Sequence, residues 1–261
     1  MLHLTLGLGL GAATTLLLSR RSNSSPRSAS SIELRYFDVT AKGLGPTLCA
    51  EFSGLNWQGN LSLKHDRKKW AQIKQNGDAP FGQQPLLTTQ TGTIIGQTVA
   101  IVNWIGREAG TDGVANVDGG WRSWSTSQML IAEGEDIYDL MQKFVPTKFV
   151  QEKAGKDKYD EFWSEILPKH VIMLEKLMKK FNYQQSMMKN NEEDPTTGEL
   201  YLFSMLYQAQ QVCPGGKDVM LGGEEEVTLV RTWYELIEKD PRTIRVLSGN
   251  SVMGELKQYF R

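Results

Sequence analysis

A short segment around two prolines has the residue types needed to hold an extended peptide. Residues 80–85 read Pro-Phe-Gly-Gln-Gln-Pro, and the apolar pair Leu86 and Leu87 follows directly. A proline that precedes a buried strand can be held cis in a tight turn, which leaves the neighbouring backbone N–H and C=O open to a ligand. Gln97 and Thr98 then open an apolar helical run. Because the first N–H groups of a helix are free and suit a carboxylate, the sequence predicts a peptide-binding site here.

This pattern resembles the glutathione-binding half of the glutathione S-transferases. It is most similar to their sigma-type branch, whose motif reads Pro-Phe-Gly-x-x-Pro and later Gln-Ser. The resemblance covers residues 32–110 well and residues 125–261 loosely. It implies a thioredoxin-like α/β domain followed by an all-α helical domain, and an enzyme that conjugates the co-substrate glutathione to hydrophobic electrophiles. Peroxidase or isomerase side activity is compatible with it, as is a homodimer with Phe81 as an inter-subunit anchor.

Tyr36, in the pair Tyr36-Phe37, matches the family's catalytic tyrosine in type and position. A free thiol has a pKa of about 8.5, so little thiolate exists at neutral pH. Lowering that pKa by ~2 units requires ~2.7 kcal/mol of preferential stabilisation, and a hydrogen bond to a charged group contributes roughly 1.5–3 kcal/mol. One well-placed phenol is therefore nearly sufficient. The alternative interpretation is a half-buried strand aromatic.

Trp70 and Lys74 reproduce a Trp-x-x-x-Lys arrangement of the family. A spacing of four places both side chains on one helical face. The resemblance implies that Lys74 pairs with the glycine carboxylate of glutathione and that Trp70 flanks it. A solvated basic face with one anchoring aromatic is the alternative.

The resemblance also assigns the rest of the glutathione contacts. Gln84, which precedes Pro85, offers its backbone to the cysteinyl moiety, and Gln97 and Thr98 bind the γ-glutamyl end. Simple capping of the helix by Thr98 is compatible with this role.

An acidic cluster in the helical half adds one more candidate. Asp136 is the implied partner of the glutathione amino group, contributed by the other subunit, and a solvated acidic face is the alternative. A hydrophobic electrophile site between the domains, or plain core packing, is expected from five apolar residues: Trp121, Trp124, Met129, Tyr138 and Met141.

The loop after Phe37 departs from the family pattern. It is longer than usual and lacks the arginine of a Gly-Arg-Ala-Glu segment, for which Lys42 is a possible substitute. Cys49 suggests thiol exchange, although no Cys-x-x-Cys is present and its apolar neighbour Leu48 favours burial. These departures keep open a second hypothesis, a non-catalytic or weakly active binding or scaffold protein on the transferase fold.

The elements that must position these residues follow a β-α-β-α-β-β-α order within residues 32–110. Residues 111–124 are interpreted as a linker because they are rich in Gly and Asp. Residues 125–261 are predicted to be helical, with a Thr-x-x-Glu capping box at Thr196 and a break at Pro168. The final helix is expected over residues 250–260.

Composition excludes several function classes. The 261 residues carry a formal net charge of −1, so no nucleic-acid partner is expected. The two cysteines favour a reducing compartment over a disulfide framework. The three histidines, His3, His65 and His170, are far apart in sequence and have no metal-ligand spacing, so no metal is expected.

The first 31 residues are predicted to lie outside the fold. Residues 2–18 carry no charge other than a protonated His3, and a Ser-rich tract with three arginines follows. An apolar stretch of this length is at the lower limit for a membrane span, and the basic flank would leave the body of the protein in the cytosol. The expectation is a cytoplasmic-facing membrane anchor. The alternatives are an organelle-targeting segment that is later removed and an ordinary tail.

Overall fold

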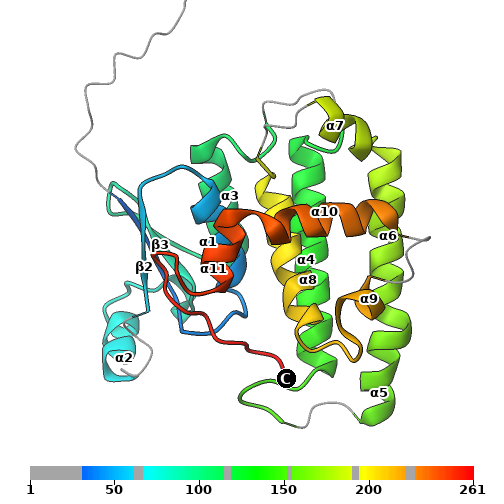
Figure 1. The fold of residues 1–261 in the computed structure, drawn as a ribbon. Helices are drawn as coiled ribbons and strands as arrows, with labels where there is room; N and C mark the ends of the chain where they lie inside the picture. Colours follow the sequence, from blue (N-terminus) through cyan, green and yellow to red (C-terminus); the bar gives the residue numbers. More distant parts are fainter. Residues whose placement is uncertain (1–30, 62–66, 115–118, 152–154, 190–193, 222–226) are drawn as a thin grey trace, which may run out of the picture.

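The chain folds into a small α/β layer joined to a larger helical body (Figure 1). The computed structural model describes residues 31–61, 67–114, 119–151, 155–189, 194–221 and 227–261. The predicted anchor, residues 2–18, lies outside the described residues. Within the described ranges no helix is both long and apolar enough to cross a membrane.

A four-stranded mixed sheet forms the centre of the first domain. Its strands are β1 (Ile32–Arg35), β2 (Trp57–Asn60), β3 (Leu86–Thr88) and β4 (Ile94–Gly96), in the spatial order β2-β1-β3-β4. β1 runs parallel to β2 and antiparallel to β3, and β4 is antiparallel to β3. The thioredoxin-like arrangement predicted from the element order is therefore present.

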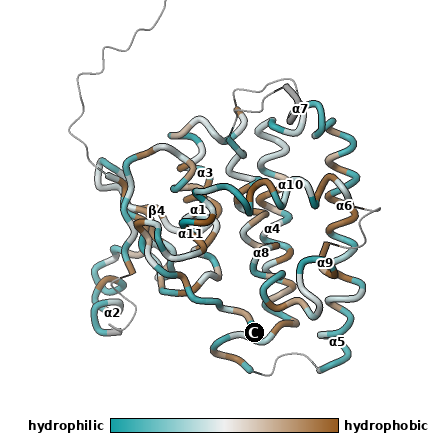
Figure 2. Tube along the Cα trace, in the orientation of Figure 1, coloured by the Kyte–Doolittle hydropathy of each residue, from teal (hydrophilic) through white to brown (hydrophobic). Residues whose placement is uncertain are grey.

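Helices cover the sheet unequally. α1 (Leu44–Phe52) and α3 (Thr98–Ala109) pack against each other and lie on the side that meets the helical body. α2 (Arg67–Gln75) lies apart from that body, and its chain is largely hydrophilic (Figure 2). The short 3-10 turn η1 (Pro80–Gly82) connects α2 to β3.

The second domain is all-helical, as predicted. Helix α8 packs against both α4 and α1, so it joins the two domains, and nearly all of its residues are buried. At Pro168 the predicted break is a π-helical stretch that ends just before the proline. The helices are α4 (Trp124–Phe144), α5 (Lys156–Glu161), η2 (Phe162–Ile166), α6 (Leu167–Lys180), α7 (Tyr183–Lys189), α8 (Thr197–Gln210), α9 (Gly216–Met220), α10 (Thr228–Lys239) and α11 (Pro241–Leu247).

The predicted capping box begins α8 and is fully buried. Thr196 accepts from the backbone N–H of Glu199, and the Glu199 carboxylate accepts from the backbone N–H of Thr196 at 2.8 Å. The other carboxylate oxygen accepts from the indole N–H of Trp121 at 2.7 Å. Trp121 is completely buried and Glu199 is 2 % exposed. A charge this deep is stabilised by these hydrogen bonds, which also tie the segment before α4 to the start of α8.

The predicted C-terminal helix over residues 250–260 is wrong. This segment, the C-terminal tail (residues 250–261), begins with a turn in which the backbone N–H of Gly254 donates to the carbonyl of Ser251, and it then continues without helix. Beyond the turn, the backbone N–H of Thr40 donates to the carbonyl of Lys257, and that of Lys257 donates to the carbonyl of Asp38. Gly249 and Gly254 have φ of 75° and 80°, which a helix does not accommodate. The prediction failed because the buried apolar residues of this segment, such as Phe260, pack against other elements and do not form one face of a helix.

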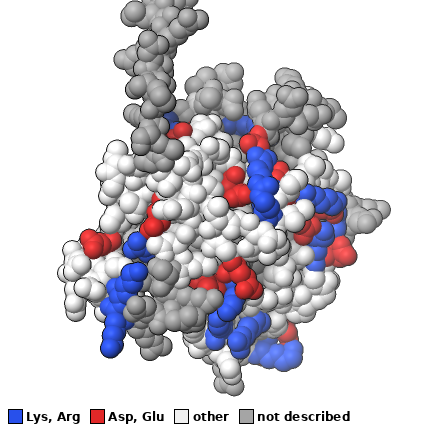
Figure 3. Space-filling model, turned by 60° about the vertical axis from the view of Figure 1, so that its left-hand side comes forward, with Lys and Arg blue, Asp and Glu red and all other residues white. Residues whose placement is uncertain are grey.

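The surface carries both signs of charge in mixture. On the face shown in Figure 3, lysines and arginines alternate with aspartates and glutamates, and wide uncharged areas separate them. Many are paired, as in Lys217 with Glu238 at 2.9 Å and Arg242 with Asp194 at 2.6 Å.

We expect Glu199→Ala to lower the free energy of unfolding by about 3 kcal/mol, because it removes a buried cap and leaves the Trp121 and Thr196 donors unpaired. Urea unfolding followed by circular dichroism measures this. Glu165→Ala, which removes an exposed ion pair with Lys169 on η2 and α6, is the matched control and should stay within about 0.5 kcal/mol of wild type. Equal effects in the two variants would contradict the role given to the buried carboxylate.

Candidate functional site

Strand register brings the principal predicted site residues to one end of the sheet. Arg35 of β1 pairs with Leu86 of β3, and Leu86 pairs in turn with Gly96 of β4. Tyr36, Pro85 and Gln97 are each one residue beyond these partners. Because both pairings are antiparallel, all three lie at the same end, where Thr98 starts α3.

Tyr36 is almost completely buried, with 5 % of its surface exposed. Its ring lies directly on Gly43, where an added Cβ would come within 2.2 Å of the ring carbon Cδ1. The backbone N–H of Lys42 donates to its hydroxyl oxygen at 3.2 Å. Among the described residues, the bond from Lys42 is the hydrogen bond that this hydroxyl makes, and in it the oxygen is the acceptor.

Burial raises the pKa of the Tyr36 phenol well above its ordinary value, and the hydrogen bond from Lys42 opposes this only in part. The phenol therefore remains protonated at neutral pH. A neutral phenol beside an anion acts as a hydrogen-bond donor and does not act as a base.

The segment before β3 contains the cis-proline that the sequence predicts and two side-chain atoms that are unpaired within the described ranges. The peptide bond between Gln84 and Pro85 is cis. Both amide atoms of the Gln84 side chain are buried, and neither has a partner among the described residues. Such atoms are rare in folded proteins and occur where a ligand or water completes the bonding.

The start of α3 has a strained backbone and open N–H groups. Gln97 occupies the N-cap position with φ 70° and ψ 123°, and its side chain is exposed and bonds Gln83 at 3.2 Å. Thr98 is the first helical residue, and no side chain caps the helix. The alternative in which Thr98 is the cap is therefore wrong. An unusual conformation of this kind persists only where its surroundings impose it, and it is frequent at ligand sites.

Trp70 and Lys74 lie on α2, next to the same end of the sheet. The Trp70 ring stacks edge-on against Phe37 with centroids 6.3 Å apart, and the Lys74 ammonium lies 5.6 Å from the Trp70 ring. The Lys74 side chain also borders Gly82 in η1.

Asp136 is not brought to this end of the sheet within one chain. It is exposed on α4. Its charge contributes to the raised pKa of His170 on α6, whose main cause is the hydrogen bond with Glu133 at 2.6 Å. The contact of Asp136 with glutathione across a subunit interface stays a prediction.

The Lys42 ammonium is already paired within the protein. Its ammonium pairs with Glu135 of α4 at 2.5 Å and lies 4.2 Å from the ring centroid of Tyr138. Glu135 also accepts from the hydroxyl of Tyr201 on α8. The idea that the Lys42 side chain replaces the missing arginine at the ligand is not supported; the part of Lys42 that contacts Tyr36 is its backbone N–H.

Cys49 is buried, and its thiol donates to the carbonyl of Thr197 at 3.7 Å. Burial raises the pKa of this thiol well above its ordinary value. It therefore stays protonated and inert, which argues against the thiol-exchange hypothesis.

The five residues expected to line an electrophile site, or to pack in the core, differ in burial. Trp121 and Met141 are completely buried and Tyr138 is 7 % exposed, whereas Trp124 and Met129 are 49 % and 42 % exposed. The alternative of plain core packing therefore holds for Trp121, Tyr138 and Met141, and Trp124 and Met129 lie at the surface.

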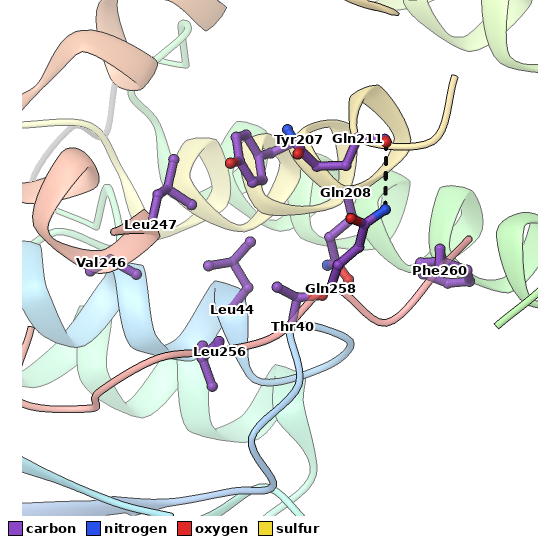
Figure 4. Close-up of a pocket in the computed structure, with 10 residues that line it drawn as sticks. All are labelled: Thr40, Leu44, Tyr207, Gln208, Gln211, Val246, Leu247, Leu256, Gln258 and Phe260. Carbon is purple, nitrogen blue, oxygen red and sulfur yellow. Dashed lines mark hydrogen bonds between the residues drawn. The ribbon is translucent and has the colours of Figure 1, made fainter. Parts of the chain in front are cut away.

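A cavity of about 170 Å³ lies instead between the domains, on the α8 side of the C-terminal tail (Figure 4). It is built by the loop after β1, by α1, α8 and α11, and by the tail. No charged side chain lines it, and its walls are Thr40, Leu44, Tyr207, Gln208, Gln211, Val246, Leu247, Leu256, Gln258 and Phe260.

The C-terminal tail joins the loop that follows Tyr36 to the helical domain. The tail makes two backbone hydrogen bonds with the loop after β1, and in a third bond the backbone N–H of Tyr259 donates to the hydroxyl oxygen of Thr40 at 3.3 Å. Phe260 is buried edge-on against Tyr138 with centroids 5.7 Å apart. No sequence signal marks these contacts, since they join segments more than 100 residues apart.

Several solved structures with a similar fold are glutathione S-transferases. No family model matches the sequence, and no curated protein matches it significantly. A glutathione S-transferase from Ascaris lumbricoides is 19 % identical, with a TM-score of 0.60 over 85 % of this chain and 98 % of its own. A sigma-class enzyme from Fasciola hepatica is 18 % identical, with a TM-score of 0.59 over 86 % and 98 %.

A monomeric glutathione S-transferase from the hookworm Necator americanus is 15 % identical, with a TM-score of 0.62 over 85 % of this chain and 98 % of its own. Pi- and nu-class enzymes also match. The chain therefore has the glutathione transferase fold, a thioredoxin-like domain followed by an all-helical one. Because several classes match about equally, the sigma-type resemblance is not singled out.

We expect Gln97→Gly to raise the free energy of unfolding by about 1 kcal/mol, because glycine adopts this φ without strain. Thermal and urea unfolding measure the change. Asn182→Gly is the control: Asn182 also has a positive φ, 52°, but asparagine tolerates the left-handed region, so its replacement should be nearly neutral. A destabilised Gln97→Gly variant would show that the conformation stores no strain.

Proposed function

We propose that this chain is a glutathione transferase in which Tyr36 stabilises the thiolate of bound glutathione for attack on a hydrophobic electrophile. The observation that carries the proposal is the strand register that places Tyr36, Pro85 and Gln97 at one end of the sheet. A tripeptide lying along that end would meet a phenol donor, an open backbone edge and a helix N-terminus in turn.

Each part of glutathione has a complementary group in this proposal. The cysteinyl backbone pairs with the backbone of Gln84 beside Pro85. The γ-glutamyl carboxylate meets the hydroxyl of Thr98 and the open N–H groups of α3, with Gln97 beside it. Lys74, flanked by Trp70, pairs with the glycine carboxylate. Asp136 of a second subunit pairs with the amino group.

In this proposal Tyr36 has to donate one hydrogen bond to the glutathione sulfur, which suits a buried, protonated phenol. A protonated, buried phenol that already accepts one hydrogen bond donates its proton toward the sulfur. The thiol releases its proton to solvent, and the thiolate forms the new carbon–sulfur bond as the leaving group of the electrophile departs with its bonding electrons. The rest of the rate comes from holding the two reactants together. The same bound thiolate is competent for peroxidase or isomerase side reactions. Among the described residues, no cluster of histidines, cysteines and carboxylates could hold a metal ion.

A second candidate function has one observation in its favour. Tyr36 is 5 % exposed, and the C-terminal tail bonds to the loop that follows it. A protein that binds glutathione without turning it over, as a weakly active or scaffold member of the fold, would have such a covered tyrosine. Retention on immobilised glutathione without conjugation of a chlorodinitrobenzene would favour this candidate.

For residues 2–18 we propose a membrane anchor that leaves the body of the protein facing the cytosol. The alternative is a targeting segment that is removed in an organelle.

We expect Tyr36→Phe to keep glutathione binding but to raise the pKa of the bound thiol by about 1–2 units, since a hydrogen bond to an anion contributes roughly 1.5–3 kcal/mol. Turnover at neutral pH should fall about 10- to 100-fold in consequence. The pH dependence of thiolate absorbance in the complex measures the pKa directly. Tyr159→Phe, on the distant α5, is the control and should leave the titration unchanged. An unaltered thiol pKa in Tyr36→Phe would refute the catalytic assignment.

We also propose a homodimer in which Phe81 inserts into the partner subunit. Phe81 is 80 % exposed and projects from η1 with φ 59°. An aromatic side chain exposed to this degree is a typical interface anchor. Sedimentation velocity should give a dimer for the wild type and a substantially weaker one for Phe81→Ser, while Phe149→Ser, which removes another exposed aromatic, should remain dimeric. A monomeric wild type, like the matching hookworm enzyme, would contradict this.

A further inference from the structure

The loop that follows Tyr36 is held by a glutamine from the helical domain. Gln208 of α8 donates from its side-chain Nε2 to the carbonyl oxygen of Ala41 at 3.0 Å. The next N–H along the chain, that of Lys42, donates to the Tyr36 hydroxyl oxygen. The Ala41 carbonyl and the Lys42 N–H belong to one peptide unit. A continuous hydrogen-bonded chain therefore leads from Gln208 through this peptide to Tyr36.

Gln208 is built into its position. It is 3 % exposed, and its Nε2 also donates to the carbonyl of Ser204 one turn earlier in α8, at 3.2 Å. Two carbonyl acceptors fix which end of the amide faces the loop, since the reverse orientation would place oxygen against oxygen. Figure 4 shows Gln208 projecting from α8 toward the loop that carries Thr40.

The state of the Gln208 Oε1 atom indicates that the bond from Gln208 to Ala41 does more than fill space. This oxygen is buried and has no partner among the described residues. An unpaired buried acceptor is destabilising, and a methionine or leucine of similar size would avoid it. The donor side of the amide is the part that makes specific contacts: its acceptors are the carbonyls of Ala41 and Ser204 and, at 3.6 Å, the Met205 sulfur, and the first of these belongs to the peptide beside Tyr36.

The peptide itself has a conformation that needs support. Ala41 has φ 25°, on the left-handed side that residues with a Cβ avoid. On its other side, Thr40 donates its N–H to the carbonyl of Lys257 in the tail at 2.8 Å. Strained backbone of this kind persists where surrounding contacts fix it. Gln208 supplies the contact on the Ala41 carbonyl.

We propose that Gln208 is a positioning residue for Tyr36, acting through the Ala41–Lys42 peptide. A carbonyl that accepts a hydrogen bond polarises the N–H of the same peptide, so the Lys42 donor becomes stronger as well as better placed. A phenol whose oxygen accepts a strong hydrogen bond is itself a better donor, here to the glutathione sulfur. The consequence for catalysis rests on the function proposed above; the consequence for Tyr36 itself does not.

The test combines Gln208→Met, which removes the donor at nearly constant volume, with Gln211→Met as the matched control. Gln211 follows α8 and lines the same cavity, but its side chain makes no bond to the loop. In protein labelled with ¹³Cζ-tyrosine, the Tyr36 resonance, identified by its loss in Tyr36→Phe, should shift in Gln208→Met and stay in place in Gln211→Met. Gln208→Glu keeps a donor only while its carboxyl is protonated, so its Tyr36 resonance should approach the wild-type position as the pH falls.

Kinetics on the full chain gives the second readout. For Gln208→Met, kcat/KM at neutral pH should fall about three- to tenfold, with an unchanged KM for glutathione and an upward shift of the acidic limb of the pH profile. A purely structural role for Gln208 would lower the melting temperature without moving that limb. An unmoved Tyr36 resonance, or equal shifts in both methionine variants, would overturn the proposal.

Two further outcomes are decisive. If the wild type does not bind glutathione, the proposed function fails, while the tyrosine resonance still decides the inference. If Gln208→Met does not fold, Gln208→Glu provides the test. Its Tyr36 resonance should lie near the wild-type position at low pH and move away from it as the carboxyl loses the donor proton; a resonance that stays at the wild-type position across the titration would overturn the proposal.

Discussion

The whole candidate site depends on the register of three short strands. Arg35, Leu86 and Gly96 face one another across β1, β3 and β4, so the residues that follow or precede them emerge at one end of the sheet. A shift of one residue in β3 would turn every side chain of that strand to the opposite face and separate Tyr36 from Pro85. The apolar residues Leu34 and Leu87, both fully buried, oppose such a shift.

The site is completed by contacts that come from outside the sheet. The loop after Tyr36 is bonded by α8 through Gln208, by α4 through the pair of Lys42 with Glu135, and by the C-terminal tail at Asp38 and Thr40. This loop is long and lacks an arginine expected from the family resemblance. Its anchoring explains how a divergent loop keeps a fixed geometry around the phenol. The helical domain therefore shapes the environment of Tyr36, although Tyr36 belongs to the sheet domain.

A local pattern in the sequence was enough to predict the capping box at Thr196, because its residues are close together in the chain and their spacing carries the information. Tyr36, Pro85 and Gln97 lie far apart in the chain, and only the family resemblance grouped them. The Gln208 contact could not be predicted, because it joins residues 167 positions apart and a glutamine in an apolar helix has no distinctive pattern. The prediction of a helix at the C-terminus failed, and the five apolar residues expected near the electrophile are divided between core and surface. In both cases the spacing of apolar residues in the sequence does not tell which partner each one packs against.

The most direct measurement of the central claim is a crystal structure of the protein with bound glutathione. The account predicts the tripeptide along the end of the sheet, its sulfur within hydrogen-bonding distance of the Tyr36 hydroxyl, its cysteinyl backbone paired with Gln84, and its γ-glutamyl carboxylate at the start of α3. A ligand bound elsewhere, or a glutathione sulfur outside hydrogen-bonding distance of the Tyr36 hydroxyl, would contradict it.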